Sequence, residues 1–357
     1  MGNIKKSELK EPPIIRGWKA TLEEREEAIK NNQMLQIYAG TSNVCDLFCI
    51  YCHTAGGKAL EGEMTLEERL NVLDQAKKLG CKYVHISGAG EPTQDPYLWK
   101  QIEHINKLGM IPTVFTHAKD ISLEIAQKFY DLNCSVIVKI HSGKEETQDY
   151  YAGVPGYTKK REKSIENLMK VGLNKSNPTR LGADIMITND NKEKIPELFK
   201  WARDNNVFPL VKSIICMERA HSDAIQDKLR IHPKEVEKIF YRLLDIDEKE
   251  YGYTWTPAPP WAGVHCDYNY YHMQVTIQGN IKPCIGFEPI GNVRDMEGAL
   301  EHYWNHPKMK KMRDIKNQLK GICSTCKEDC YGCPCRRIAR VGEDEAFNTK
   351  SCWEANL

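Results

Sequence analysis

The chain has 357 residues, 41% of them hydrophobic, and its 50 basic and 49 acidic residues leave a formal net charge of +1. This length and composition predict a large buried core in more than one structural module. They exclude a small disulfide-rich secreted protein, and the balanced charge gives no indication of an obligate nucleic-acid partner.

The first residues hold no apolar signal segment, and no apolar run approaches the length of a membrane-spanning helix. We therefore expect a cytoplasmic protein without a membrane partner. Its 14 cysteines are unevenly placed: three lie in one short segment, eight follow residue 265, and Cys81, Cys134 and Cys216 stand alone. In a reducing cytoplasm such thiols bind metal rather than form disulfides.

The N-terminal part leads into the first cysteine segment. Residues 1–20 are polar and contain two prolines, which predicts an irregular lead-in, followed by a short charged helix over residues 21–30. A strand predicted over residues 34–38 then leads into a loop that holds Cys45, Cys49 and Cys52.

This loop can direct three thiolates at one metal centre, because its three cysteines lie within eight residues. Structural zinc sites and most iron–sulfur clusters take four protein ligands. Three cysteines with no fourth cysteine close by therefore predict a cluster with one iron left open for a substrate or cofactor. A small zinc knuckle is the alternative for these residues by themselves.

A unit of short apolar strand, loop and amphipathic helix recurs from this loop to about residue 216. Further strands are predicted over residues 83–86, 111–115, 136–140, 181–187 and 210–216. Helices are predicted over residues 65–79, 97–108, 122–132, 159–171 and 195–204. Strands that alternate with helices in this way predict a parallel sheet with helices outside it.

The residues that follow each strand are the candidate site, because chemistry in parallel α/β barrels lies at the carboxyl ends of the strands. After the second strand, Gly88 and Gly90 let the backbone approach a ligand closely, and Glu91 supplies a negative charge. Polar residues also follow the third, fourth and fifth strands. The alternative for each of them is a hydrogen bond to the backbone of its own loop.

The α/β pattern ends near residue 217, and a proline-rich stretch over residues 254–261 has the composition of a stiff linker. A half-buried hairpin is predicted from Met273 to a turn at Gly279. The predicted domains are a lead-in over 1–33, an α/β domain over 34–253 and a cysteine-rich domain over 254–357.

Eight cysteines lie in this last domain, and eight thiolates match two iron–sulfur clusters with four protein ligands each. Structural zinc is the alternative. The candidate ligands are Cys266, Cys284, Cys323, Cys326, Cys330, Cys333, Cys335 and Cys352.

Two parts of the chain resemble known families. The spacing C-x3-C-x-aromatic-C, with Tyr51 before the third cysteine, resembles that of the radical S-adenosylmethionine (SAM) enzymes, and the segment from Gly88 to Glu91 resembles their GGE motif. The C-x12-G-x4-C spacing that starts at Cys266, and the Gly-Asn-Val stretch at Gly291, resemble the SPASM domain. That domain is a C-terminal extension with up to two auxiliary [4Fe-4S] clusters. The resemblance covers nearly the whole chain, from about residue 34.

The resemblance implies an α/β fold, in which a partial (β/α)6 TIM-like barrel is followed by a small cysteine-rich α+β domain. It implies that the three loop cysteines hold a [4Fe-4S] cluster whose open iron binds SAM. One electron, from a low-potential donor such as flavodoxin or ferredoxin, then cleaves SAM to methionine and a 5′-deoxyadenosyl radical, which abstracts hydrogen from the substrate. The SAM-binding residues that it implies are Tyr51, Gly88, Gly90, Glu91, Thr116, Ser142 and Asn189.

The chain departs from the family patterns at three points. The late cysteines are not spaced as in the SPASM domain, so single thiolates are not assigned to one cluster. Ile285 stands where sulfatase-maturating members have an aspartate base, which counts against that activity. Only 44 residues precede Cys45, too few for the leader-binding domain that peptide-modifying members often carry.

We predict an enzyme that abstracts hydrogen from a small polar substrate, such as a sugar, cyclitol or nucleoside, in an oxidation, epimerisation or rearrangement. The first alternative is radical modification of a ribosomally made peptide or protein. The alternative from another class is a non-catalytic iron–sulfur electron carrier or a zinc scaffold, which would not bind SAM. Cys216, at the end of the sixth predicted strand, is the candidate hydrogen donor for an epimerisation, and a buried structural cysteine is its alternative.

Overall fold

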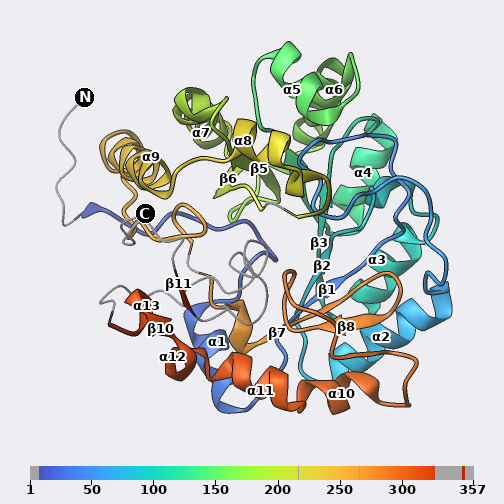
Figure 1. Cartoon of the computed structure of the whole chain (residues 1–357). Helices are drawn as coiled ribbons and strands as arrows, with labels where there is room; N and C mark the ends of the chain where they lie inside the picture. The colour runs from blue at the N-terminus through green and yellow to red at the C-terminus, as the bar shows by residue number, and fades with distance from the viewer. Residues whose placement is uncertain (1–7, 216, 265, 326–347, 350–357) are drawn as a thin grey trace.

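The computed structural model describes residues 8–215, 217–264, 266–325 and 348–349. Its strands are β1 (Gln36–Ala39), β2 (Tyr83–Ile86), β3 (Ile111–Thr116), β4 (Ser135–Lys139), β5 (Leu181–Ile187), β6 (Phe208–Ser213), β7 (His272–Val275), β8 (Asn280–Lys282), β9 (Gly291–Asn292), β10 (Lys320–Gly321) and β11 (Asn348–Thr349). Nine of them form one sheet in the order β6-β5-β4-β3-β2-β1-β7-β8-β9 (Figure 1). Neighbours from β6 to β7 are parallel, whereas β8 and β9 run antiparallel.

Helices surround this sheet (Figure 1). They are α1 (Leu22–Lys30), α2 (Leu66–Lys78), α3 (Leu98–Lys107), α4 (Leu123–Asp131), α5 (Glu145–Ala152), α6 (Tyr157–Lys170), α7 (Ile195–Asp204), α8 (Asp223–Leu229), α9 (Pro233–Ile246), α10 (Ala299–Trp304), α11 (Pro307–Arg313), α12 (Ile315–Gln318) and α13 (Ile322–Thr325). At the start of α2, Thr65 and Glu68 form the reciprocal hydrogen bonds of a capping box. These bonds satisfy backbone N–H groups that a helix start leaves unpaired, so the sequence signature and the helix start coincide.

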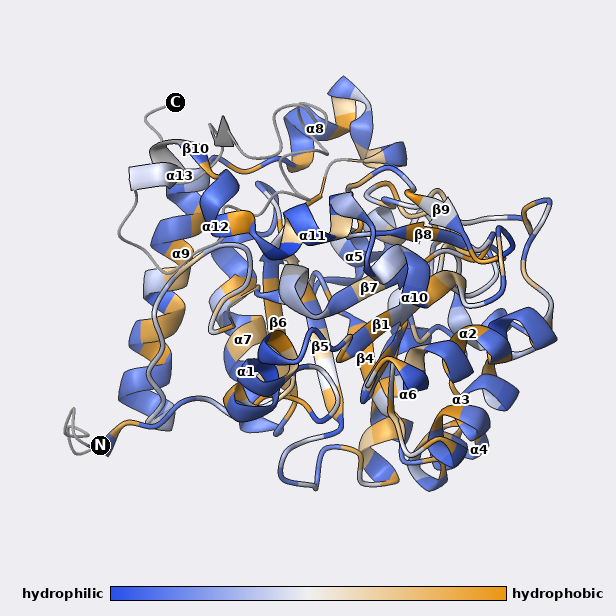
Figure 2. Cartoon of the chain, turned by 90° about the horizontal axis from the view of Figure 1, so that it is seen from below, coloured by the Kyte–Doolittle hydropathy of each residue, from blue (hydrophilic) through white to orange (hydrophobic). Residues whose placement is uncertain are grey.

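The strands place alternate residues on the two faces of the sheet. On the outer face, Val84, Val114 and Val136 are fully buried in one hydrophobic cluster with the helices. On the inner face, Ile137 and Leu210 belong to a second buried cluster. Figure 2 shows hydrophobic residues on strands such as β5 and β6, and hydrophilic residues along the outward sides of many helices.

The N-terminal lead-in completes the inner core. Trp18 is 1% exposed, and its ring stacks on that of His85 with centroids 4.8 Å apart and meets Phe115 and Trp261 edge-on. Burial lowers the pKa of His85 to about 3, so the stacked ring is neutral. The lead-in is irregular as predicted, but it is a buried part of the core because Ile15 and Trp18 insert beneath the sheet.

The sheet is an open, partial barrel, as predicted, since no described strand joins β6 to β9. The segment after residue 254 spans the open side. Ala262 donates its amide to the carbonyl of Val211 in β6 at 3.0 Å, and β7 then pairs with β1. One sheet therefore continues past residue 254, where the domain boundary stays a prediction.

Most strands and helices of the sequence analysis lie where it expects them, and the hairpin of β7 and β8 is confirmed. The helices α5 and α8 were not predicted. Strand β6 ends at Ser213, earlier than predicted, because Ser213 pairs with Ile187 at the end of β5. Cys216 follows this strand and lies outside the described residues. No described helix is long and apolar enough to cross a lipid bilayer.

Candidate active site

The cysteine loop follows β1 and is held by backbone hydrogen bonds on two sides. Cys45 donates its amide to the carbonyl of Gly57 at 2.8 Å, and Phe48 donates its amide to the carbonyl of Ala152 at 3.0 Å. Ala152 is the last residue of α5, and it packs with Leu47 in a small apolar cluster. The loop therefore depends on a helix that the sequence pattern did not reveal.

The three thiols of this loop are each half-buried. Burial and the neighbouring thiols of Cys52 and Cys45 raise the pKa of Cys49 to about 12. A thiol in such surroundings becomes a thiolate only when a cation shares its charge, and a metal centre supplies that charge. The three side chains thus fit the predicted iron–sulfur cluster, which binds thiolates.

The loop after β2 lies directly against the cysteine loop, and two glycines make this contact close. Gly90 donates its amide to the carbonyl of Ser42 at 3.0 Å, and Glu91 donates its amide to that of Val44 at 2.8 Å. A Cβ at Gly90 would lie 2.2 Å from the carbonyl oxygen of Val44, and a Cβ at Gly88 would lie 2.0 Å from the Thr41 hydroxyl. Both glycines are thus required by backbone packing, whatever ligand they also approach.

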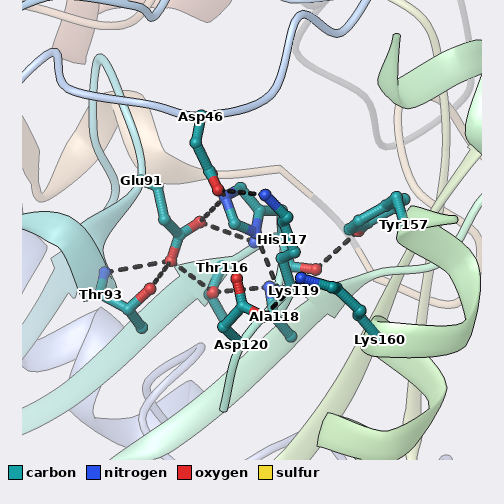
Figure 3. A network of polar contacts seen from close by, with 10 residues as sticks. All are labelled: Asp46, Glu91, Thr93, Thr116, His117, Ala118, Lys119, Asp120, Tyr157 and Lys160. Atoms are coloured by element: carbon teal, nitrogen blue, oxygen red, sulfur yellow. Dashed lines mark hydrogen bonds and ion pairs between the residues drawn. The ribbon is translucent and has the colours of Figure 1, made fainter. Parts of the chain in front are cut away.

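Glu91 is 2% exposed, and its carboxylate is surrounded by donors (Figure 3). It accepts hydrogen bonds from the amide and hydroxyl of Thr93 at 3.0 and 2.8 Å, from the hydroxyl of Thr116 at 2.5 Å and from the amide of His117 at 2.8 Å. Glu91 and Thr116, both predicted to contact SAM, therefore contact each other. The carboxylate ties the loop after β2 to the end of β3, and its contact with SAM stays a prediction.

His117 carries a positive charge beside the cysteine loop. Its Nε2 lies 3.1 Å from Asp46 Oδ1 and 3.5 Å from Glu91 Oε2. Burial alone would lower the pKa of His117, but the charges of Glu91 and Asp46 outweigh it and raise the pKa to about 10. Ligand atoms of Cys45, Asp46 and His117 all lie within 4.8 Å of one another.

Arg161, on α6, was not selected from the sequence. Its side chain is buried, and Nη2 donates to the carbonyl of Ser142 at a long 3.5 Å. Its Nε and Nη1 have no hydrogen-bond partner among the described residues. A buried guanidinium with two unpaired donors fits a bidentate carboxylate, the group that an amino-acid ligand such as SAM carries. Sequence spacing gives no signal for it, because α6 is separated from β4 by α5.

Tyr51 and Ser142 both lie near Arg161. The ring of Tyr51 meets that of His141 edge-on, with centroids 4.6 Å apart. His141 and Ser142 follow β4, and both donate their amides to the side-chain oxygen of Gln148, at 2.8 and 3.0 Å. The structure therefore places Tyr51 and Arg161 against the end of β4, and the SAM contacts of Tyr51 and Ser142 stay predictions.

Asn189 is exposed, and its side chain accepts a hydrogen bond from Lys192 at 3.0 Å. A neighbouring side chain, Asn191, is buried and donates to the carbonyls of His141 and Met186 at 2.7 Å each. Asn191 thus links the ends of β4 and β5. A sequence pattern cannot tell which of two asparagines so close together is buried. The SAM contact of Asn189 stays a prediction.

A cavity of about 180 Å³ lies on the inner face of the sheet. One side is lined by residues next to the cysteine loop, among them Thr54 and Gly88, and another by Cys266 and Cys284. Aromatic side chains form much of the remaining wall: Trp18, Tyr38, Phe115, Trp261 and Tyr268. A molecule in this cavity would touch residues next to the cysteine loop and two predicted ligands of the auxiliary clusters.

The remaining late cysteines are not placed in this way. Cys323 lies in the short helix α13, of which only the backbone is described. The other predicted ligands, Cys326, Cys330, Cys333, Cys335 and Cys352, lie outside the described residues. Their assignment to auxiliary clusters stays a prediction.

One family model matches the part of the chain that holds the cysteine loop, and another matches the C-terminal cysteine-rich part. The model described as "Radical SAM superfamily" matches residues 40–202, which include the cysteine loop and the strands β2 to β5. The SPASM model, described as an iron–sulfur cluster-binding domain, matches residues 266–331.

Relatives and solved structures agree with these matches. AdoMet-dependent heme synthase from Methanosarcina barkeri is 24% identical, over 84% of this chain and 90% of its own length. Mycofactocin maturase MftC from Mycobacterium ulcerans is 25% identical, over 36% of this chain and 35% of its own. The fold is similar to that of Streptococcus suis SuiB bound to the precursor peptide SuiA, with a TM-score of 0.67 and 16% identity, covering 92% of this chain and 79% of that one.

Proposed function

Because the chain belongs to the radical SAM superfamily and ends in a SPASM iron–sulfur domain, we propose that it modifies a peptide or protein substrate by abstracting one of its hydrogen atoms. The family establishes that the protein is an enzyme and that it uses a [4Fe-4S] cluster, SAM and auxiliary iron–sulfur binding. The substrate and the role of each residue are our proposal.

The cavity is the observation that carries this proposal. It joins the neighbourhood of the cysteine loop to Cys266 and Cys284, so a substrate there would lie between the two iron–sulfur regions. When bound, the cluster and SAM supply a one-electron cleavage that yields a 5′-deoxyadenosyl radical able to abstract hydrogen from a C–H bond. The chain's own contribution is to hold SAM through Arg161 and the end of β4, and to exclude water with the aromatic wall.

Two observations bear on the substrate. SuiB, which shares this fold, is described with a bound precursor peptide, and this supports a peptide substrate. The heme synthase, which is similar over most of the chain, is named for a product that is not a peptide. A small polar substrate is therefore the second candidate. For either substrate, the electron would come from a low-potential donor such as flavodoxin or ferredoxin in a cytoplasmic setting.

Transfer of deuterium to 5′-deoxyadenosine tests the proposal. Reconstituted enzyme, SAM and dithionite are incubated anaerobically with either the peptide fraction or the small-molecule fraction of fully deuterated cells. Mass spectrometry then shows which fraction delivers deuterium to 5′-deoxyadenosine. We expect label from the peptide fraction. Label from the small-molecule fraction alone would replace a peptide by a small substrate, and the absence of 5′-deoxyadenosine from all samples would refute SAM cleavage itself.

A further inference from the structure

Three charged side chains meet on the inner face of the sheet, beside the cavity. Lys139 ends β4, Asp184 lies opposite it in β5, and Lys212 lies in β6. Lys139 forms an ion pair with Asp184, and the ammonium of Lys212 lies 2.9 Å from the same carboxylate. All three point inward, because the alternate residues Ala183, Ile185 and Val211 belong to the outer core.

This trio presents its positive members to the cavity. Asp184 is fully buried, whereas the side chains of Lys139 and Lys212 are 25% and 22% exposed, and both lysines line the cavity. Burial would raise the pKa of Asp184, but the two ammonium groups outweigh it and hold the pKa well below its usual range. Two ammonium groups in the lining of the cavity thus share this one buried carboxylate.

Apart from these two lysines, the described lining of the cavity is mostly apolar. The described residues that line it include two lysines and neither Asp nor Glu. His272, also in the lining, stays neutral because burial lowers its pKa to about 3. Aromatic side chains also line the cavity, and the ring centroid of Phe115 lies 5.7 Å from the ammonium of Lys139. An apolar cavity with a few charged donors of one sign orients a ligand that has an apolar body and a group of opposite charge.

We propose that Lys139 and Lys212, positioned by Asp184, bind a carboxylate of the substrate and so fix its orientation in the cavity. This rests on the proposed function, since it names the chemistry of the molecule that the same cavity receives. In a peptide the carboxylate belongs to an acidic side chain or to the C-terminus, and in a small substrate to an organic acid. SAM brings a carboxylate too, but the unpaired donors of Arg161 on α6 fit that group.

Binding of matched acid and amide probes to the reconstituted full-length protein with SAM tests this proposal. The small-molecule pair is 2-naphthoate and 2-naphthamide, and the peptide pair is N-acetyl-Trp-Glu-amide and N-acetyl-Trp-Gln-amide. Equilibrium dialysis without oxygen measures the four dissociation constants. A charge-assisted hydrogen bond predicts that the acid of at least one pair binds about tenfold more tightly than its amide. The pair that shows the preference indicates whether the carboxylate belongs to a peptide or to a small acid.

Variants of the charged residues test whether the two cavity lysines cause this preference for the acid over the amide. Lys139→Met and Lys212→Met should each abolish most of it, whereas Lys159→Met, at a lysine that is 74% exposed and paired with Glu145 on the surface, should keep it. Asp184→Asn should strengthen it, because both ammonium groups then lack their counter-charge.

Two results would overturn the proposal: equal binding of acid and amide in both pairs, or a loss of SAM affinity in either cavity-lysine variant, which would assign these lysines to the carboxylate of SAM. Formation of 5′-deoxyadenosine by the wild-type protein in the same samples separates failure of this proposal from failure of the proposed function.

Discussion

Replacement of Glu91 by glutamine separates two roles for this side chain: a contact with SAM and an anchor for the loop after β2. Its carboxylate accepts four hydrogen bonds and lies 3.5 Å from the charged ring of His117. Glutamine keeps one carbonyl oxygen, but its NH2 group meets donors such as the amide of His117. The change therefore removes the charge and places two donors against each other.

The structure gives the size of the effect. Burial alone would lower the pKa of His117, but Glu91, Asp46 and Cys45 together raise it from 6.5 to about 10, a difference that corresponds to roughly 5 kcal/mol in favour of the charged ring. Among the groups that raise this pKa, Glu91 makes the largest contribution. Glu91→Gln should therefore lower the free energy of unfolding by about 3 kcal/mol, which is the low end of the cost of breaking a buried ion pair.

The pH dependence follows from the direction of this shift. A pKa that is raised in the folded state adds stability that is complete below the unfolded value near 6.5 and is lost as the pH rises toward 10. The wild-type protein should therefore lose stability between pH 7 and 10. Glu91→Gln should lose less over the same range, because its His117 is already less strongly held in the charged form.

Urea denaturation of the SAM-free protein without oxygen, followed by circular dichroism, measures both effects. We expect a midpoint roughly 1 M lower for Glu91→Gln at pH 7. Glu166→Gln is the matched control, because Glu166 is 67% exposed in its ion pair with Lys163 and should change stability little. If Glu91 serves only to bind the ammonium group of SAM, the SAM-free variant will be as stable as the wild type, and the anchoring role is refuted.

Four further predictions concern the cofactor site and its surroundings. Replacement of all three cysteines of the first loop by alanine should abolish formation of 5′-deoxyadenosine from SAM. Three [4Fe-4S] clusters in the wild-type protein imply about twelve irons per chain. A content of four irons with bound zinc would refute the auxiliary clusters. Arg161→Met should weaken SAM binding about tenfold or more in equilibrium dialysis, and unchanged affinity would assign the carboxylate of SAM to another residue. Gly90→Ala should destabilise the protein by about 1–3 kcal/mol, whereas Gly57→Ala, where a Cβ meets no atom within 4 Å, should not.

Local sequence signals predict the strands and helices of the barrel well. The capping box of Thr65 and Glu68 starts a helix as expected, because the bonds that it forms are local. The inward burial of Trp18 has no such signal, since its partners His85 and Trp261 lie far along the chain. Helix α5 was missed because its sequence, Glu-Glu-Thr-Gln-Asp-Tyr-Tyr-Ala, is short and mostly polar.

The site shows the same limit at the level of single side chains. Spacing places Gly88, Gly90 and Glu91 after a strand, but it does not tell whether they face a ligand or the neighbouring loop. The structure shows their contacts with the neighbouring loops, at residues 41–44 and Thr116, and it also places Gly88 in the lining of the cavity. Arg161 gave no signal at all, because its value for binding comes from unpaired donors that only the packing of α6 creates.

The register of two strands relates the first cluster to the C-terminal domain. Strand β7 pairs in parallel with β1, and the amide of Gly40 donates to the carbonyl of Val275 at 2.9 Å just beyond this pairing. The loop that leads from β1 to Cys45 and the hairpin that leads from β7 to Cys284 therefore leave the sheet at the same edge. Strand pairing holds these starting points together, whereas a flexible linker would leave their distance variable. Because residues of both segments line the cavity, this pairing constrains its two sides, and an enzyme that abstracts hydrogen needs such a constraint to hold one C–H bond of its substrate in position.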